Sequence, residues 1–323
     1  MRLCIPKNGH NMKLGCILVN YNNGSGTRLF DFSRGPSEEP AVPNDFLSLC
    51  LDSYFNSIWM DNHFIIVDDG STDNNMEIIN SYKDRVSEII VNGSNIGLAP
   101  SMQMAASRLI DAGCDAICRF DADIEFLTAG WDFRFMKHFA EYPTSAAIGG
   151  CQILPHGAIW SMGDMIIHPR GYTHIMMDSP GRNVFETSVF LNENLILGNI
   201  ECDSVMGCLA AFRSSAYQQV GGLRKEFEIV RGQTEDLNLR FLLEGYQCMA
   251  LGGVAFIHRH SEHAPKTAIT DKTANQSLQV WRDVWGWDKI KPDLNAIYEQ
   301  WKGTRLTRHL VVDKEGAVSY IGP

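Results

Sequence analysis

The sequence has little positive charge and no long apolar run. Its 323 residues carry 28 Lys and Arg against 38 Asp and Glu, which gives a formal net charge of -10 at pH 7. Proteins that wrap nucleic acid or dock on acidic membranes need clustered Lys and Arg, so neither role is expected. The longest apolar stretches, such as Met249–Ile257, have about half of the roughly 20 residues that cross a bilayer. We therefore expect no nucleic-acid partner and no transmembrane segment.

Closely spaced cysteine pairs are also missing. The nine cysteines are scattered, and none forms the Cys-x-x-Cys pair that is typical of zinc sites and redox couples. Reduced thiols and a cytoplasmic location are the expectation, with no secretory signal. The lack of an anchor does not exclude work at a membrane surface, so a peripheral location stays open as well.

What the sequence does contain is apolar segments in an alternating order. Short apolar runs typical of strands buried on both faces alternate with segments whose apolar residues recur at helical spacing. Strands are expected at 14–20, 64–67, 88–91, 116–120 and 248–257, and helices near 44–59, 73–82, 98–112, 213–219 and 234–244. This order predicts βαβ units and an α/β fold, in which a mostly parallel sheet is flanked by helices.

The predicted domain organisation has three parts. Residues 1–13 form an N-terminal lead, 14–262 the main domain, and 263–323 a helical C-terminal extension with a hairpin near its end. The long loop 24–43 is either a lid over the site or an idle insertion. Packing is the commoner use of tryptophan, so we expect three residues of the extension to pack against the main domain rather than stack on sugars: Trp281, Trp285 and Trp287.

Acidic residues cluster where predicted strands end. Asp68 and Asp69 follow the second strand, and Asp121 and Asp123 follow the fourth. In open α/β sheets, ligands bind beyond the carboxyl ends of the strands. Two carboxylates at alternate positions of an extended chain lie on one side and repel each other unless a cation neutralises them. The Asp-Ala-Asp sequence therefore predicts a Mg²⁺ or Mn²⁺ site, although a solvated turn would show the same pattern.

Five motifs follow one another along residues 14–262. They are Val67-Asp-Asp-Gly-Ser-Thr-Asp73, Asn95-Ile-Gly-Leu98, Phe120-Asp-Ala-Asp123, Gly207 with Gly221-Gly222-Leu223, and Thr234-Glu-Asp-Leu-Asn-Leu-Arg240 followed by Gly245-Tyr246. Each motif alone is weak, whereas the ordered set is specific. In this order the chain resembles the family 2 glycosyltransferases, which have the Rossmann-like GT-A fold.

The resemblance implies a site for a nucleoside diphosphate sugar. The substrate-binding residues that it implies are Asn20, Asn22, Asp68, Asp69, Asn95, Gly97, Asp121 and Gly207. The first two strand ends would hold the base and ribose. A carboxylate there can accept from the imide N–H of uracil or thymine, which favours a UDP- or dTDP-sugar. An ordinary turn is the alternative interpretation of the Asp-Asp-Gly-Ser motif.

The same resemblance implies a metal site. Asp123 would coordinate the ion that bridges the two phosphates, and Asp121 would bind the ion or the ribose hydroxyls. His258 would complete the metal shell, with His260 as the alternative. The ion would stabilise the charge that builds up on the departing diphosphate.

Glu235 and Asp236 match the acidic pair that supplies the general base in inverting members of the family. Asp236 is the expected base, and Glu235 would support the pocket or touch the acceptor. Both acids could instead serve only the positive end of a helix dipole, and Arg240 could be a helical ion-pair partner of little energy.

The predicted function is metal-dependent transfer of a sugar to an acceptor hydroxyl with inversion, the acceptor being a glycan, a lipid-linked molecule or a protein. A retaining transferase on the same fold, a sugar nucleotidyltransferase and a non-catalytic sugar-nucleotide-binding protein are the alternatives.

Overall fold

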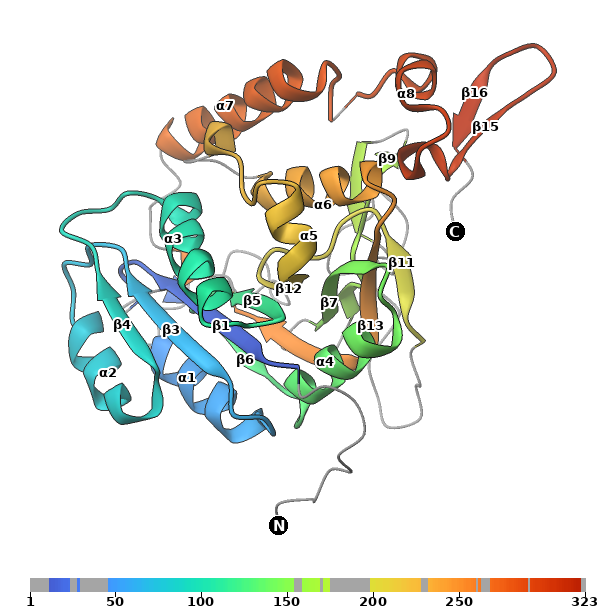
Figure 1. Ribbon diagram of the computed structural model, residues 1–323. Coiled ribbons are helices and arrows are strands. Elements are labelled where there is room, and N and C mark those ends of the chain that lie inside the picture. The colour runs from blue at the N-terminus through green and yellow to red at the C-terminus, as the bar shows by residue number, and fades with distance from the viewer. Residues whose placement is uncertain are drawn as a thin grey trace.

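A ten-stranded sheet forms the centre of the molecule (Figure 1). The computed structural model describes residues 12–23, 28–29, 46–153, 159–168, 171–174, 198–227, 232–259, 261–262, 268–289 and 291–320. Along the sheet the strand order is β11-β13-β7-β12-β5-β1-β3-β4, with β6 beside β13 and β8 beside β7. The predicted α/β fold is confirmed.

One half of the sheet is parallel, as the sequence predicts. Its strands are β1 (Leu14–Asn20), β3 (His63–Asp68), β4 (Glu88–Val91) and β5 (Ala116–Phe120). The helices between them are α1 (Phe46–Ser57), α2 (Asn75–Ser81) and α3 (Leu98–Asp111), with the 3₁₀ helix η1 (Lys83–Arg85) after α2. Because these strands run the same way, the carboxyl ends of β1, β3 and β5 lie at one edge.

The other half of the sheet is mixed. Its strands are β6 (Ile124–Phe126), β7 (Ser145–Ile153), β8 (Ile159–Ser161), β11 (Ile200–Cys202), β12 (Leu209–Arg213) and β13 (Gln247–His258). Strand β12 starts beside the end of β5, with Leu209 opposite Phe120, so these two strands are antiparallel. Strand β12 is also antiparallel to β7. Strands β7 and β13 pair in parallel. The expected predominance of parallel pairing therefore holds for the β5-β1-β3-β4 half alone.

Two long elements of this half differ from the sequence expectation. Helix α4 (Trp131–Glu141) was not predicted, although Trp131, Phe135 and Phe139 recur every four residues and are buried. After residue 146 the sequence pattern indicates only short strands and glycine-rich turns, whereas β7 is one continuous strand of nine residues that contains Gly149 and Gly150. A Cβ on Gly150 would lie 2.6 Å from the carbonyl oxygen of Val254, so this strand needs glycine where β13 crosses close to it.

The sheet has a hydrophobic core on each face. One core lies between the sheet and helices α1 and α4, and the other between the sheet and α3, α5 (Ser214–Gln219) and α6 (Gln233–Leu243). Residues 225–227 form the 3₁₀ helix η3. No helix in the described part of the chain combines the length and apolar character that crossing a bilayer requires.

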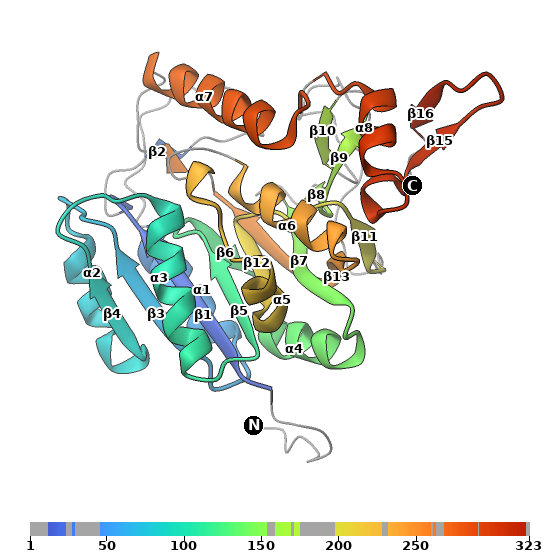
Figure 2. The ribbon, with the colours of Figure 1, turned by 45° about the horizontal axis from the view of Figure 1, so that its top comes forward.

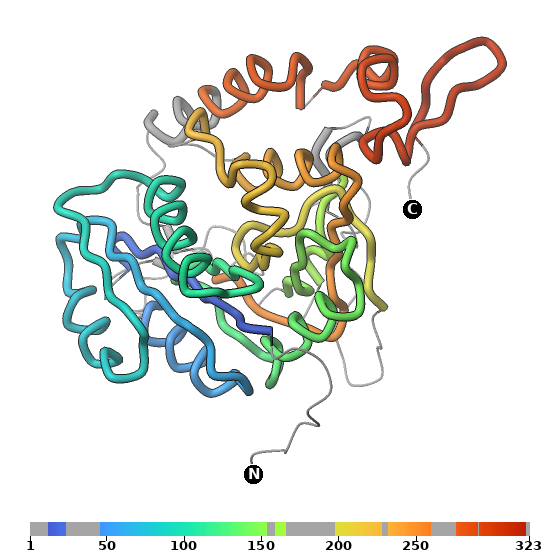
Figure 3. Tube along the Cα trace, viewed as in Figure 1, coloured from blue at the N-terminus to red at the C-terminus, as the bar shows by residue number. Residues whose placement is uncertain are grey.

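The C-terminal extension packs on the core that contains α6. It comprises α7 (Ala268–Trp285), α8 (Leu294–Trp301), η4 (Arg305–Thr307) and a hairpin of β15 (Leu310–Val312) and β16 (Val318–Tyr320). Helix α7 lies over α6 in two views (Figures 1 and 2), and the hairpin projects from the body at the red end of the trace (Figure 3). Trp281, Trp285 and Trp287 are buried in that core. The predicted packing role of these tryptophans and the predicted hairpin are confirmed.

Two small sheets complete the fold. Strands β9 (Asp164–His168) and β10 (Gly171–His174) pair with each other, and β2 (Arg28–Leu29) pairs with β14 (Ser261–Glu262). The segment that was predicted as a loop or lid thus contributes β2. The rest of 24–43, the predicted lead up to residue 11 and His260 lie outside the described residues.

Candidate metal and nucleotide site

A cavity of about 370 Å³ opens at the carboxyl ends of β1, β3 and β5. It is lined by residues from five separate segments of the chain: Val19, Asn20, Tyr21, Asn23, Asp69, Asn95, Leu98, Asp121, Ala122, Asp123 and His258. The predicted site residues Asn20, Asp69, Asn95, Asp121, Asp123 and His258 are among them. The other predicted residues, which are Asn22, Asp68, Gly97, Gly207, Glu235 and Asp236, do not line this cavity.

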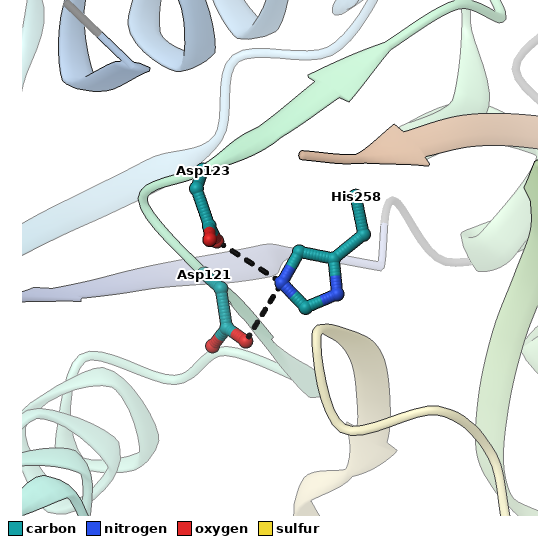
Figure 4. Close-up of side chains that lie close together, drawn as sticks. All are labelled: Asp121, Asp123 and His258. Carbon is teal, nitrogen blue, oxygen red and sulfur yellow. Dashed lines mark hydrogen bonds and ion pairs between the residues drawn. The ribbon is translucent and has the colours of Figure 1, made fainter. Parts of the chain in front are cut away.

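Asp121, Asp123 and His258 converge at one side of the cavity (Figure 4). Each offers one ligand atom, and these atoms all lie within 4.8 Å of one another. The Nε2 atom of His258 lies 3.1 Å from Oδ1 of Asp123 and 3.9 Å from Oδ2 of Asp121. The sheet register explains the meeting, because His258 ends β13 opposite Ile124, the residue that follows Asp123.

The donor set of this cluster fits a divalent cation. Two carboxylates and one imidazole suit Mn²⁺ or Mg²⁺, with the imidazole better matched to Mn²⁺. Burial lowers the pKa of His258, but the charge of Asp123 and the hydrogen bond to its carboxylate outweigh that effect and raise the pKa well above its usual value. A bound cation would need the neutral imidazole as a ligand.

Arg119 is a buried cation beside this cluster that the sequence interpretation missed. Its guanidinium group forms an ion pair with Asp121 from within the apolar strand β5. The sequence feature that could have indicated its role is a single Arg in a run of buried residues, two positions before an Asp. This ion pair holds the Oδ1 side of Asp121, while Oδ2 faces His258.

Two polar residues at the end of β1, Tyr21 and Asn23, line the cavity and were not among the predicted site residues. Tyr21 lines the cavity and is 40% exposed, so its ring is accessible from solvent. The side chain of Asn23 donates to Oδ1 of Asn20, 3.1 Å away. Asn22 instead has a positive φ of 52°, and its Oδ1 accepts from the backbone N–H of Thr72 at 2.9 Å. Asn22 thus joins the end of β1 to the turn after β3.

The two acids after β3 have different environments. Asp68 is buried, and its carboxylate accepts from Asn20 Nδ2 at 3.2 Å and from the backbone N–H of Ser71 at 3.1 Å. Asp69 lines the cavity and holds the next segment: it accepts from the side chains of Asn92 and Ser101 and from the backbone N–H groups of residues 96 and 97. The structure therefore places Asp69, and not Asp68, at the cavity wall.

Gly70 allows this turn to meet the segment that Asp69 holds. Its φ is +77°, and a Cβ there would lie 2.5 Å from the carbonyl carbon of Ser94 and 2.7 Å from the backbone nitrogen of Asn95. We expect Gly70→Ala to lower the free energy of unfolding by about 2 kcal/mol or more, because both the positive φ and the backbone clash oppose alanine. Urea titration would measure the change.

Gly93→Ala is the matched control for this substitution, since a Cβ at Gly93 meets no atom within 4 Å. The control should unfold like the wild type. Equal stability of the Gly70 variant and its control would contradict the described contact between the turn and residues 94–95.

The carboxylate of Asp236 is enclosed in an ion-pair network. Its Oδ2 accepts from Nε and Nη2 of Arg240 at 2.9 and 2.8 Å, and its Oδ1 accepts from Trp285 Nε1 at 3.1 Å. Arg224 Nε lies 3.5 Å from Oδ1. Burial raises the pKa of Asp236, and the two guanidinium groups offset part of that rise. The expectation that Asp236 meets the acceptor is not supported by this geometry, because the side chain is fully buried and both of its oxygens are bonded.

The start of α6 nevertheless lies beside the carboxylate cluster. A Cβ on Gly207 would lie 2.7 Å from Oγ1 of Thr234 and 3.5 Å from Nη1 of Arg119, the partner of Asp121. Gly207 therefore allows α6 and the end of β5 to pack closely, and it is not part of the cavity wall. Glu235 follows Thr234 and accepts from Lys289 Nζ at 3.0 Å.

The α/β sheet with paired acids beyond its carboxyl edge is a Rossmann-like arrangement, in which ligands bind at that edge. A family model described as "Glycosyl transferase family 2" matches residues 42–221, more than half of the chain. The chain belongs to glycosyl transferase family 2. A search of curated proteins gives no match.

Solved structures of similar fold agree with this assignment. GalNAc-T7 with UDP, GalNAc and Mn²⁺ is 12% identical, with a TM-score of 0.60 over 85% of this chain and 48% of that chain. TarS from S. aureus is 12% identical, with a TM-score of 0.52 over 84% and 39%. The mannosyltransferase PcManGT from Pyrobaculum calidifontis, with GDP-Man and Mn²⁺, is 13% identical, with a TM-score of 0.52 over 87% and 68%. The chain spans less than half of the length of the first two, and at these identities the likeness concerns the fold alone.

Proposed function

We propose that this protein transfers a sugar from a nucleoside diphosphate sugar to an acceptor hydroxyl in a reaction that needs a divalent cation. The observation that carries the proposal is the meeting of Asp121, Asp123 and His258 at the wall of one cavity. These three residues would hold the ion, Mn²⁺ in preference to Mg²⁺. When bound, the ion supplies positive charge that offsets the charge growing on the departing diphosphate.

The protein's own residues would bind and orient the donor. Tyr21 offers a ring face for a base, and the side chains of Asn20 and Asn95 offer amide groups for hydroxyl or phosphate oxygens. Asp69 can accept an imide N–H, which supports the proposed preference for a UDP- or dTDP-sugar. The structurally similar proteins GalNAc-T7 and PcManGT were solved with UDP and with GDP-Man, respectively, so the choice of base is the finer part of the proposal.

The acidic pair at the start of α6 is the proposed source of the general base. An inverting displacement needs a carboxylate that takes the proton of the acceptor hydroxyl as its oxygen attacks the anomeric carbon. Glu235 and Asp236 belong to the helix whose Thr234 lies next to Gly207, and Gly207 lies next to Arg119, the ion-pair partner of Asp121. Transfer with inversion is the proposed outcome. Retention is the alternative, and the anomeric configuration of the product distinguishes the two.

Calorimetry with nucleotides tests the proposal. We expect UDP to bind in the presence of Mn²⁺ and to bind at least about tenfold more weakly when Mn²⁺ is replaced by EDTA, because the ion held by Asp121, Asp123 and His258 would offset the negative charge of the diphosphate. GDP should bind more weakly than UDP under the same conditions. A panel of UDP- and GDP-sugars then identifies the donor by hydrolysis, and NMR of the first-formed anomer distinguishes inversion from retention. UDP binding that is indifferent to Mn²⁺ would contradict the metal site.

A further inference from the structure

The C-terminal extension reaches both acids at the start of α6. Trp285, the last residue of α7, donates its indole N–H to Asp236. Four residues later, Nζ of Lys289 lies 3.0 Å from Oε1 of Glu235. Both members of the Lys289–Glu235 pair are mostly enclosed, with side-chain exposures of 13% and 15%. A surface ion pair is worth little, but an enclosed one fixes the geometry of its members.

The ammonium group of Lys289 is held from two sides. Glu235 binds it, and the ring centroid of Trp281 lies 5.0 Å away, which is within the range of a cation–π contact. Trp281 itself is buried in the core shared by the extension and α6. Lys289 is therefore held close to Glu235, so the extension contributes to the orientation of the Glu235 side chain.

The two acids differ in what they can offer to a substrate. Asp236 has no exposed side-chain surface, and its carboxylate bonds to Arg240 and Trp285. Glu235 retains exposure and follows Thr234, which contacts Gly207 beside the metal cluster. In the described arrangement, Glu235 is thus the member of the pair that a substrate can approach.

We propose that Glu235 is the acid that serves the acceptor, and that Lys289 of the C-terminal extension is its positioning residue. This inference rests on the proposed function. As the acceptor oxygen bonds to the anomeric carbon, its proton passes to the Glu235 carboxylate, and the bond to the diphosphate breaks with its electron pair leaving on the diphosphate. The Lys289 ammonium group holds the Glu235 carboxylate in position for this proton transfer.

Donor hydrolysis by the full chain tests this inference. The probe is the sugar nucleotide that the wild type hydrolyses fastest with Mn²⁺, because water then replaces the acceptor. We expect Glu235→Gln to lower kcat by about 100-fold or more, since a positioned base contributes about 10²- to 10⁴-fold. Lys289→Met should lower kcat by about tenfold, and Lys289→Arg should recover most of that loss. The KM for the donor and the Kd for UDP with Mn²⁺ should stay within about twofold of the wild type in all three.

Lys302→Met is the matched control, because Lys302 also forms an ion pair in the extension, with Glu299, but both side chains are exposed. It should hydrolyse the donor like the wild type. The double variant Glu235→Gln/Lys289→Met should be no slower than Glu235→Gln alone, because Lys289 acts through Glu235.

Three results would overturn the inference: Lys289→Met as active as the control, losses that add in the double variant, or a Lys289→Arg variant as slow as Lys289→Met. If one of these results is obtained but the wild type still binds UDP with Mn²⁺ and hydrolyses the donor, the inference fails and the proposed function is retained. A wild type that binds no UDP with Mn²⁺ would remove the proposed function, and this inference with it.

Discussion

Asp123→Asn should abolish Mn²⁺-dependent binding of UDP and lower donor turnover by about 10³-fold or more. Asparagine keeps the shape of the side chain but removes the negative charge and one anionic ligand from the cluster with Asp121 and His258. A metal ion at a developing diphosphate contributes several kcal/mol of charge stabilisation, and a loss of about 4 kcal/mol corresponds to about 10³-fold in rate. The variant should fold like the wild type, because the asparagine amide can still bond to the ring nitrogen of His258.

Calorimetry with UDP and Mn²⁺ measures the binding, and hydrolysis of the donor measures the rate. Asp84→Asn is the control, since Asp84 is exposed in η1 and lies outside the cavity. It should behave like the wild type in both assays. If Asp123→Asn still binds UDP more tightly with Mn²⁺ than with EDTA, the ion is held elsewhere and the assignment of the cluster fails.

The parallel half of the fold and the two Asp residues of the metal cluster were predictable from the sequence because each depends on local patterns. Buried strands that alternate with helices leave short apolar runs, and the acids that follow those runs must meet at one sheet edge. The approach of His258 to Asp123 depends on the pairing of β13 with β6, a contact across 135 residues. The resemblance to family 2 glycosyltransferases, and not periodicity, gave that residue its predicted place.

The parts of the site that the sequence left open depend on partners far along the chain. The motif around Asp236 suggests a base in the first turn of a helix. No residue near Asp236 in the sequence indicates that Trp285, 49 residues later, donates a hydrogen bond to it. Likewise, the Arg119 side chain enters the site from a strand whose pattern indicates only burial. Whether an acid is a catalyst or a structural anchor is decided by such contacts, which periodicity does not encode.

That distinction gives the second large effect, because Asp236→Asn should lower the free energy of unfolding by about 3–5 kcal/mol. The substitution leaves Arg240 as a buried cation without its carboxylate, and removing one member of a buried ion pair costs about that much. It also weakens the bond from Trp285, which joins the extension to α6. Urea titration followed by tryptophan fluorescence measures the loss. Asp111→Asn, at the exposed end of α3, should unfold like the wild type.

The same variant separates the two roles proposed for the acidic pair. If Asp236 is an anchor, the donor hydrolysis lost in Asp236→Asn should follow the fraction of unfolded protein and recover in part at low temperature or with a stabilising osmolyte. If Asp236 were the base, the variant would be well folded, would bind UDP with Mn²⁺, and would still be inactive. Glu235→Gln is expected to show that second behaviour, since its side chain is partly exposed and pairs with Lys289 rather than with a fully buried guanidinium group. A stable, inactive Asp236→Asn beside an active Glu235→Gln would reverse the assignment of the two acids.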